Sequence, residues 1–110
     1  FNPHVIPSFR GILSSIYVEP EKGVTINKIR FKLKKYYKSM PFVKILTKDK
    51  GISTGNVIHT NNCEISICNT RKKNKFVIFS AIDNLIKGAS GQAVQNMNLI
   101  YNFKETIGLK

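Results

Sequence analysis

Hydrophobic and polar positions along the chain follow two periods, one typical of strands and one typical of helices. Alternating or continuous apolar runs predict strands over residues 12–18, 42–46, 56–60, 63–69 and 75–82. Four successive apolar residues, 76–79, indicate that the last of these strands is central and buried on both faces. The three strands between 56 and 82 have short links, so we expect them to form an antiparallel meander.

A first helix is expected near residues 25–39. Its apolar residues recur at helical spacing and form one stripe, at Ile26, Ile29, Leu33 and Tyr36 or Tyr37. The hydroxyl of Thr25 can cap the first turn. The helix should end before Pro41, because the residue ahead of a proline avoids the α region.

A second helix is expected near residues 90–102, after a tight segment that contains Gly88 and Gly91. Its predicted apolar stripe consists of Ala93, Met97 and Ile100 or Tyr101. Gln92 and Asn96 share a polar second face. The start of such a helix can receive an anion or a polar ligand group, or the helix can simply dock on the sheet.

These elements predict an α+β fold with a mostly antiparallel or mixed sheet. The length, 110 residues, indicates a single domain or part of one. Residues 1–10 contain two prolines and are expected to form an extended loop or an edge segment.

Charge and cysteine content indicate which partners and which redox environment to expect. The chain has 18 basic and 6 acidic residues, a formal net charge of +12 that favours anionic partners or a solvated lysine-rich surface. It contains no apolar run of the ~20 residues needed to span a bilayer. Cys63 and Cys68 are an odd number of residues apart in one strand, so they point to opposite faces and cannot pair there. We infer a reducing, cytoplasmic setting.

Few residues suggest a catalytic, ligand-binding or metal-binding role. His4 and Arg10 lie in one proline-bounded loop, which could bind a carboxylate or a phosphate. His59 is expected to be a packed or surface residue of a strand. The cysteines lie inside a strand pattern without an obvious base, and the acidic residues form no evident metal cluster.

Two long blocks resemble N-acetyl-gamma-glutamyl-phosphate reductases. They are N-P-H-V-I-P-S-F-R-G-I-L-S-S-I-Y-V at 2–18 and A-I-D-N-L-I-K-G-A-S-G-Q-A-V-Q-N-M-N-L at 81–99. The similarity includes P-F-V at 41–43 and N-N-C-E-I at 61–65, and it continues through residues 103–109. The order and spacing of these blocks make the resemblance specific.

The resemblance implies an NADPH-dependent enzyme of arginine biosynthesis that reduces an acyl phosphate through a cysteine thioester. Such enzymes combine a dinucleotide-binding domain with an α+β catalytic and oligomerisation domain, and they form homo-oligomers. The chain resembles the last third, with residues 84–110 expected to pack on the dinucleotide-binding domain. The family's G-x-G-x-x-G loop and its nucleophilic cysteine in a P-G-C-Y-type motif do not occur in the sequence. We therefore expect no catalytic residue within residues 1–110 and no activity from them alone.

By the same resemblance, His4 and Arg10 border the substrate pocket, and Arg10 would hold a substrate anion. Asn84, Gly88 and Gln92 would approach the nicotinamide end of NADP, and no metal is implied.

Two alternatives remain open on the residues alone. One is a small basic nucleic-acid-binding module that uses the lysine-rich helix and the basic hairpin at 71–75. The other is a domain that serves only oligomerisation.

Overall fold

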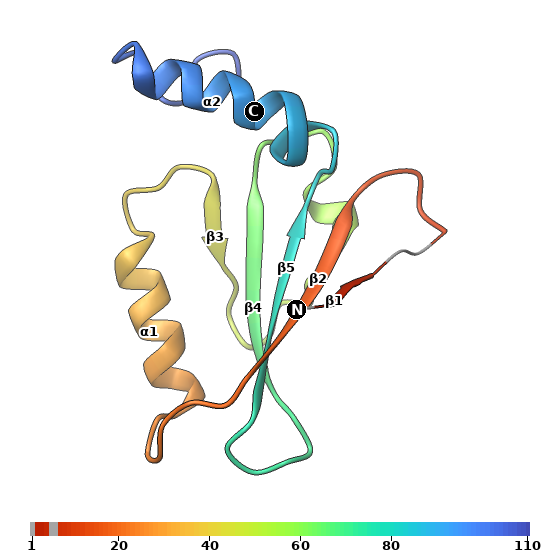
Figure 1. Ribbon diagram of the computed structural model, residues 1–110, viewed down its shortest axis with the longest axis vertical. Helices are drawn as coiled ribbons and strands as arrows, with labels where there is room; N and C mark the ends of the chain where they lie inside the picture. The colour runs from red at the N-terminus through yellow and green to blue at the C-terminus, as the bar shows by residue number, and fades with distance from the viewer. Residues whose placement is uncertain (1, 5–6) are drawn as a thin grey trace.

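Strand β5 (Phe76–Ile82) lies at the centre of a five-stranded mixed sheet of order β1-β2-β5-β4-β3 (Figure 1). The computed structural model describes residues 2–4 and 7–110. The other elements are β1 (Asn2–His4), β2 (Ile12–Val18), α1 (Ile26–Tyr36), β3 (Val43–Ile45), the 3-10 turn η1 (Thr54–Asn56), β4 (Cys63–Asn69), the π-turn η2 (Ile86–Ser90) and α2 (Gly91–Ile100). The predicted α+β class and the central position of β5 are confirmed.

The predicted three-stranded meander is confirmed only in its second half, where β4 and β5 pair antiparallel; its first strand, over 56–60, is wrong. Residues 56–60 form η1 and turns, where His59 has a φ of 61°, a left-handed conformation that no strand accommodates. The second neighbour of β5 is instead β2, which pairs with it antiparallel from Ile12 opposite Ile82 to Val18 opposite Phe76. Strand β3 pairs with β4 in parallel and makes the sheet mixed. Part of the N-terminal segment is the expected edge strand β1, whereas residues 1, 5 and 6 lie outside the described part.

Helix α1 has the predicted boundaries to within a few residues. The Thr25 hydroxyl accepts the N–H of Lys28 at 3.3 Å and caps the first turn, and the helix ends at Tyr36, ahead of Pro41. It runs along the edge of the sheet, beside β3 and β4 (Figure 1). None of its side chains is fully buried. Among residues 2–4 and 7–110, no helix has the length and apolar character required to cross a membrane.

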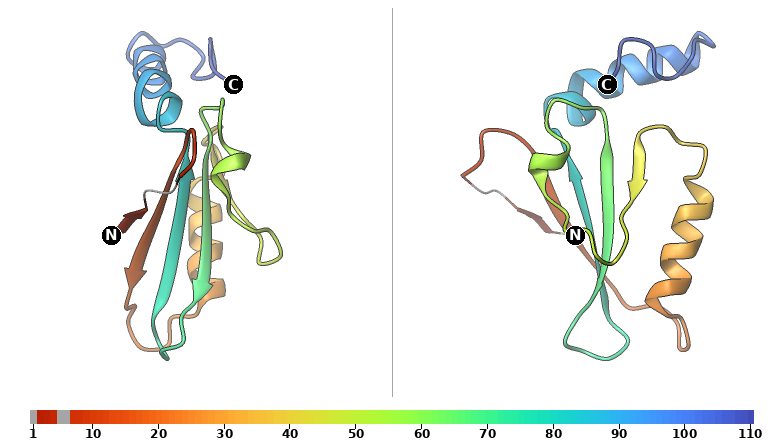
Figure 2. Two further views of the ribbon diagram at one scale, coloured as in Figure 1. Left: turned by 90° about the vertical axis from the view of Figure 1, so that its right-hand side faces the viewer. Right: turned by 180° about the vertical axis from the view of Figure 1, so that it is seen from behind.

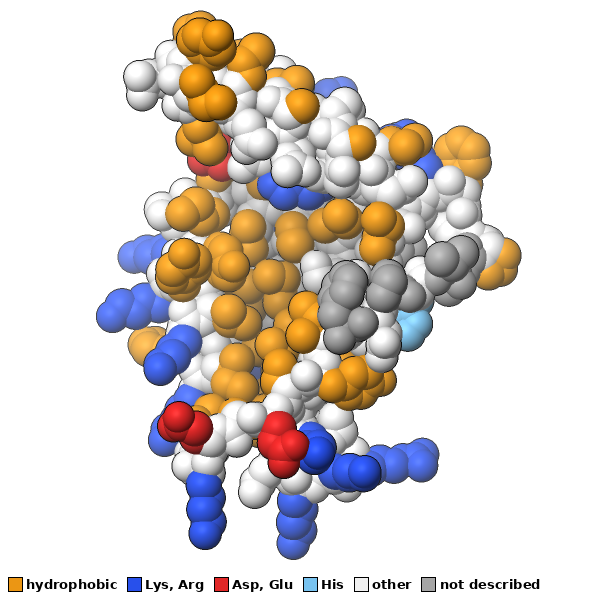
Figure 3. Space-filling view, in the orientation of Figure 1, with side chains coloured by type: hydrophobic (Ala, Val, Ile, Leu, Met, Phe, Trp, Pro, Cys, Tyr) orange, Lys and Arg blue, Asp and Glu red, His pale blue; other side chains and the backbone are white. Residues whose placement is uncertain are grey.

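The two faces of the sheet differ in what covers them. Residues 47–60 cross the back face (Figure 2), where the Asn56 amide donates to the Glu64 carboxylate at 3.2 Å and Val57 is fully buried. The front face is partly open, and Figure 3 shows apolar side chains across its middle. The strand register places these residues on it: Ile12, Ile16, Val18, Val43, Ile45, Ile65, Ile67, Ile78 and Ile82. We call this surface the apolar sheet face.

Helix α2 lies across the end of the sheet, with a C-terminal segment folded back along it (Figures 1 and 2). The predicted apolar stripe does not face the sheet, since Met97, Ile100 and Tyr101 are 45%, 74% and 67% exposed. The buried residues of the helix are Gly91 and Asn98. The apolar stripe of α2 is therefore left open, and the helix contacts the rest of the chain through Gly91 and polar side chains.

Candidate functional site

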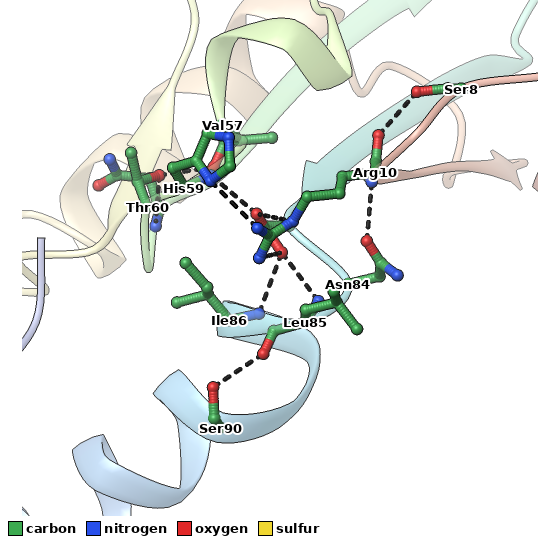
Figure 4. Close-up of polar contacts among 12 residues, drawn as sticks. Ser8, Arg10, Val57, His59, Thr60, Asn84, Leu85, Ile86 and Ser90 are labelled. Atoms are coloured by element: carbon green, nitrogen blue, oxygen red, sulfur yellow. Dashed lines mark hydrogen bonds and ion pairs between the residues drawn. The ribbon is translucent and has the colours of Figure 1, made fainter.

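Three distant segments meet where β5 ends, around the side chain of Asp83. Arg10 comes from the segment ahead of β2, and His59 from the turn between η1 and β4. Figure 4 shows Arg10 and His59 converging with the backbone of Leu85 and Ile86, at the start of η2. We call these five residues the Asp83 cluster.

Asp83 has no exposed surface and accepts several hydrogen bonds. The backbone N–H groups of His59, Leu85 and Ile86 donate to its carboxylate at 2.7, 2.8 and 3.0 Å. The Arg10 guanidinium approaches from the other side, with Nη2 3.2 Å from Oδ1 and Nε 3.1 Å from Oδ2. A buried carboxylate is tolerated only with such partners.

These contacts favour the ionised form of Asp83. Burial alone would raise the pKa of the carboxyl. The hydrogen bonds from the three backbone N–H groups and from Arg10 outweigh burial and hold the pKa of Asp83 below its ordinary value of 3.8. The cluster therefore carries a fixed buried anion paired with a cation.

The anion-receiving helix start suggested by the sequence is occupied by the protein itself. η2 runs directly into α2, and Asp83 accepts from the first N–H groups of this continuous helical segment. Next to it, the Asn84 side-chain oxygen accepts the Gly11 N–H at 2.8 Å and ties the end of β5 to the start of β2. The turn after β5 is thereby held in position.

His4 and Arg10 are placed in different hydrogen-bond networks. His4 lies on the outer strand β1, and its Nε2 is 2.6 Å from the hydroxyl of Ser15 on β2. Arg10 instead contacts Asp83, and its Nη1 lies 3.1 Å from Nδ1 of His59. Because arginine can only donate, Nδ1 accepts and the proton of the neutral imidazole is on Nε2.

The sequence did not single out His59 as part of this site. Its role arises from its backbone N–H and its turn conformation, which no residue-type pattern reveals. The predicted strand over 56–60 would also have placed it in the sheet. The adjacent asparagines, Asn61 and Asn62, were the one signal for a turn.

The residues proposed to approach a cofactor lie along one segment. Gly88 and Gln92 are exposed, and Asn84 is half-buried. A Cβ built on Gly88 would lie 3.5 Å from the nearest atoms, an ordinary contact, so packing does not require glycine there. Gly91 differs, because a Cβ would collide with the Asn61 side chain and lie 2.5 Å from Cγ2 of Ile86.

A second polar network docks α2. The Gln95 side-chain oxygen accepts from Asn61 at 2.9 Å and from Lys87 at 2.5 Å, and its amide donates to Glu105 at 2.6 Å. The Asn98 amide donates to the carbonyls of Glu105 and Ile107 at 3.1 and 2.9 Å, which fastens the C-terminal segment. Together these bonds hold residues 84–110 as one unit above the sheet.

The described residues contain no group of three or more His, Cys, Asp or Glu side chains that could hold a metal ion. Both cysteines are free thiols, as expected from their opposite faces. The Sγ of Cys63 lies 3.5 Å from the Ser80 hydroxyl, which is not a base that could activate a thiol.

The family model described as "Semialdehyde dehydrogenase, dimerisation domain" matches residues 1–84. The chain belongs to this family. A solved structure of aspartate semialdehyde dehydrogenase II from Vibrio cholerae, complexed with ASA, superimposes with a TM-score of 0.64 at 16% identity. It covers 88% of this chain and 29% of that one, and it supports the α+β fold of the family.

Curated relatives of the family extend the similarity over the whole chain. N-acetyl-gamma-glutamyl-phosphate reductases are 49% identical over 109 residues in Clostridium kluyveri, 46% over 109 in Clostridium botulinum and 44% over 110 in Halothermothrix orenii. These matches cover 99–100% of this chain but only 32% of each relative. The resemblance inferred from the sequence blocks is confirmed, and the chain spans about a third of these relatives' length.

Proposed function

We propose that this chain is the C-terminal, dimerisation part of an N-acetyl-gamma-glutamyl-phosphate reductase. Such an enzyme uses NADPH to reduce an acyl phosphate to the corresponding aldehyde. The observation that carries the proposal is the 44–49% identity to these reductases, which continues past the family match at residue 84. The comparisons do not favour the alternative of a nucleic-acid-binding module.

Two surfaces of the chain have a role in this proposal. The apolar sheet face would pack against a second copy. The exposed side chains of α2, among them Met97, Ile100 and Tyr101, would contact a dinucleotide-binding domain, as expected for residues 84–110. The apolar side chains of α2 that the sheet does not cover support that role.

The Asp83 cluster would shape the pocket between these parts. Arg10 and His4 would border the acyl-phosphate substrate, and Asn84, Gly88 and Gln92 would approach NADP. Gly88 supports this assignment, because its surroundings do not need a glycine for packing. Arg10 uses two of its nitrogens on Asp83, so we propose that only its remaining donors reach a substrate anion.

A chimaera tests the proposal directly. The matching segment of the Clostridium kluyveri reductase is replaced by residues 1–110, and NADPH oxidation by N-acetyl-γ-glutamyl phosphate is measured. We expect kcat/KM within about tenfold of the parent enzyme, a difference of ~1.4 kcal/mol in transition-state binding. Residues 1–110 alone should show no turnover. A folded chimaera without activity would contradict the proposal.

Two variants of the chimaera test the site residues. Arg10→Lys replaces a planar fork of donors by a point charge and should lower kcat/KM by about tenfold. Gly88→Ala should raise the KM for NADPH while the melting temperature stays unchanged. Gly51→Ala, at a position with no atoms within 4 Å of the added Cβ, is the matched control. Unchanged kinetics in either variant would remove that residue from the site.

A further inference from the structure

A cavity of about 400 Å³ lies between the first turns of α1 and the lower half of β4. We call it the Arg30 pocket. Its lining consists of Ile26, Asn27, Arg30, Lys48, Ile67, Cys68 and Asn69. It shares no lining residue with the Asp83 cluster, and of its lining only Ile67 also belongs to the apolar sheet face.

The pocket exists because β3 is short. β3 pairs with β4 only as far as Ile65, so the outer edge of β4 beyond that residue has no strand beside it (Figure 1). Within the described chain, the N–H of Cys63 donates to Phe42 and the carbonyl of Ile65 accepts from Leu46, at 2.7 and 2.8 Å. Backbone groups alternate in direction along a strand, so the N–H groups of Ile67 and Asn69 point to this same open edge.

Arg30 partly fills the place of the missing strand. Its Nη2 donates to the Ile67 carbonyl and its Nη1 to the Asn27 side chain, each at 3.2 Å. Its Nε is buried and has no hydrogen-bond partner among the described groups. A buried donor without a partner is costly, which favours an acceptor at this position.

The charged residues that line the pocket are all positive. Arg30 and Lys48 are cations, Asn27 and Asn69 add amide donors, and the lining contains no acidic residue within the part of the chain that the structure describes. The ion pairs recorded in that same part, Arg10 with Asp83 and Lys75 with Glu19, involve neither cation. Donors from two side-chain cations and a strand edge therefore converge without an internal anion.

We propose that the Arg30 pocket binds a small organic anion through a phosphate or carboxylate group. Guanidinium, ammonium and backbone N–H groups are the donors that recognise such groups. Ile26 offers apolar contact for the rest of the ligand, and the volume suits a small metabolite.

Amide NMR titrations of the 110-residue chain test this inference. Inorganic phosphate and malonate are added separately at constant ionic strength and near-neutral pH. We expect saturable shifts of the Asn27, Ile67 and Asn69 amides. Tighter binding of phosphate would identify a phosphorylated ligand, and tighter binding of malonate a carboxylate ligand; either result supports the pocket.

Matched variants separate the pocket from the general charge of the chain. Lys48→Gln should weaken binding about tenfold, the loss of one charge-assisted hydrogen bond. Lys34→Gln removes the same charge from an exposed position of α1 outside the pocket and should leave binding within about twofold. Lys48 is exposed, so its replacement should not disturb folding.

Arg30→Lys keeps the charge but loses the planar fork, and it should also weaken binding. Shifts that never saturate with either anion would overturn the proposal. So would equal weakening in Lys48→Gln and Lys34→Gln, which would show only diffuse attraction to a chain of net charge +12.

Discussion

Asp83 shows how a single buried charge organises the end of the sheet. It is within hydrogen-bond distance of groups that come from residue 10, from residue 59 and from the turn that follows β5. Removing the carboxylate would leave the Arg10 cation uncompensated and three N–H groups without an acceptor. Removing one partner of a buried ion pair lowers the stability of the protein strongly, even where the intact pair contributes little to stability.

The pH dependence of stability should follow from this carboxylate. Since folding lowers the pKa of Asp83 below 3.8, its stabilisation is fully present above that pH and is lost as the pH falls through the folded pKa. We expect Asp83→Asn to lower the free energy of unfolding near neutral pH by about 3 kcal/mol. The difference from wild type should shrink below about pH 4. Urea unfolding at several pH values measures both effects.

Asp49→Asn is the matched control for this experiment, because Asp49 is exposed in a loop. We expect it to change the free energy of unfolding by no more than about 0.5 kcal/mol. An Asp83→Asn protein that is as stable as wild type across the whole pH range would show that the cluster does not hold the fold together.

At the scale of elements, the docking of α2 depends on close backbone approach and polar contacts. Gly91 lies against Ile86 and the Asn61 side chain, and Gln95 bonds to the same asparagine. These contacts hold the continuous η2 and α2 segment in its position above the sheet. A π-turn of this kind often occurs at functional sites.

Glycine replacements should separate the packing of this segment from ligand approach. Gly91→Ala forces a Cβ into Asn61 and Ile86, and overpacking of this kind costs about 1–3 kcal/mol. Gly88→Ala meets only ordinary contacts and should change the free energy of unfolding by less than about 0.5 kcal/mol. Chemical unfolding of the two variants measures the contrast. Equal stability of the two proteins would contradict the role assigned to Gly91.

At the scale of the whole molecule, apolar side chains exceed what the chain itself can bury. In the part of the chain that the structure describes, the buried apolar residues are few, namely Phe42, Leu46, Val57, Ile67, Phe76, Val77 and Ala81. Several of the most deeply buried side chains are polar, including Asn61, Asp83 and Asn98. The open apolar sheet face and the exposed stripe of α2 therefore fit a chain that completes its core with partners.

Self-association should depend on the apolar sheet face. Ile16→Asp places a charge in the middle of this face and should weaken dimerisation by tenfold or more, about 1.4 kcal/mol. Tyr17→Asp places the same charge on the opposite face, at a side chain that is 63% exposed, and should leave the dimer intact. Sedimentation equilibrium measures the dissociation constant, and circular dichroism verifies folding. A monomeric wild-type chain, or equal effects of both variants, would contradict this assignment.

Local patterns were sufficient for the elements whose burial is periodic. The Thr25 cap and Pro41 bounded α1, and four apolar residues marked β5 as the centre of the sheet. The blocks around Arg10 and Gly88 pointed to the family through the identity and order of their residues. Each of these features depends on a few neighbouring residues, because the spacing of apolar side chains and the backbone preferences of single residues determine local structure.

Only the tertiary structure decided what lies around Asp83. Its partners are 73 and 24 residues away along the chain, and two of the three segments contribute through backbone groups that carry no residue-type signal. The docking of α2 likewise depends on the hydrogen bond between Gln95 and Asn61, which are 34 residues apart along the chain. The sequence alone determined both helices, most of the strands and the family, because periodicity reports which side chains are apolar and the ordered blocks carry the family resemblance. It could not determine which surface covers them, because that depends on contacts between distant segments.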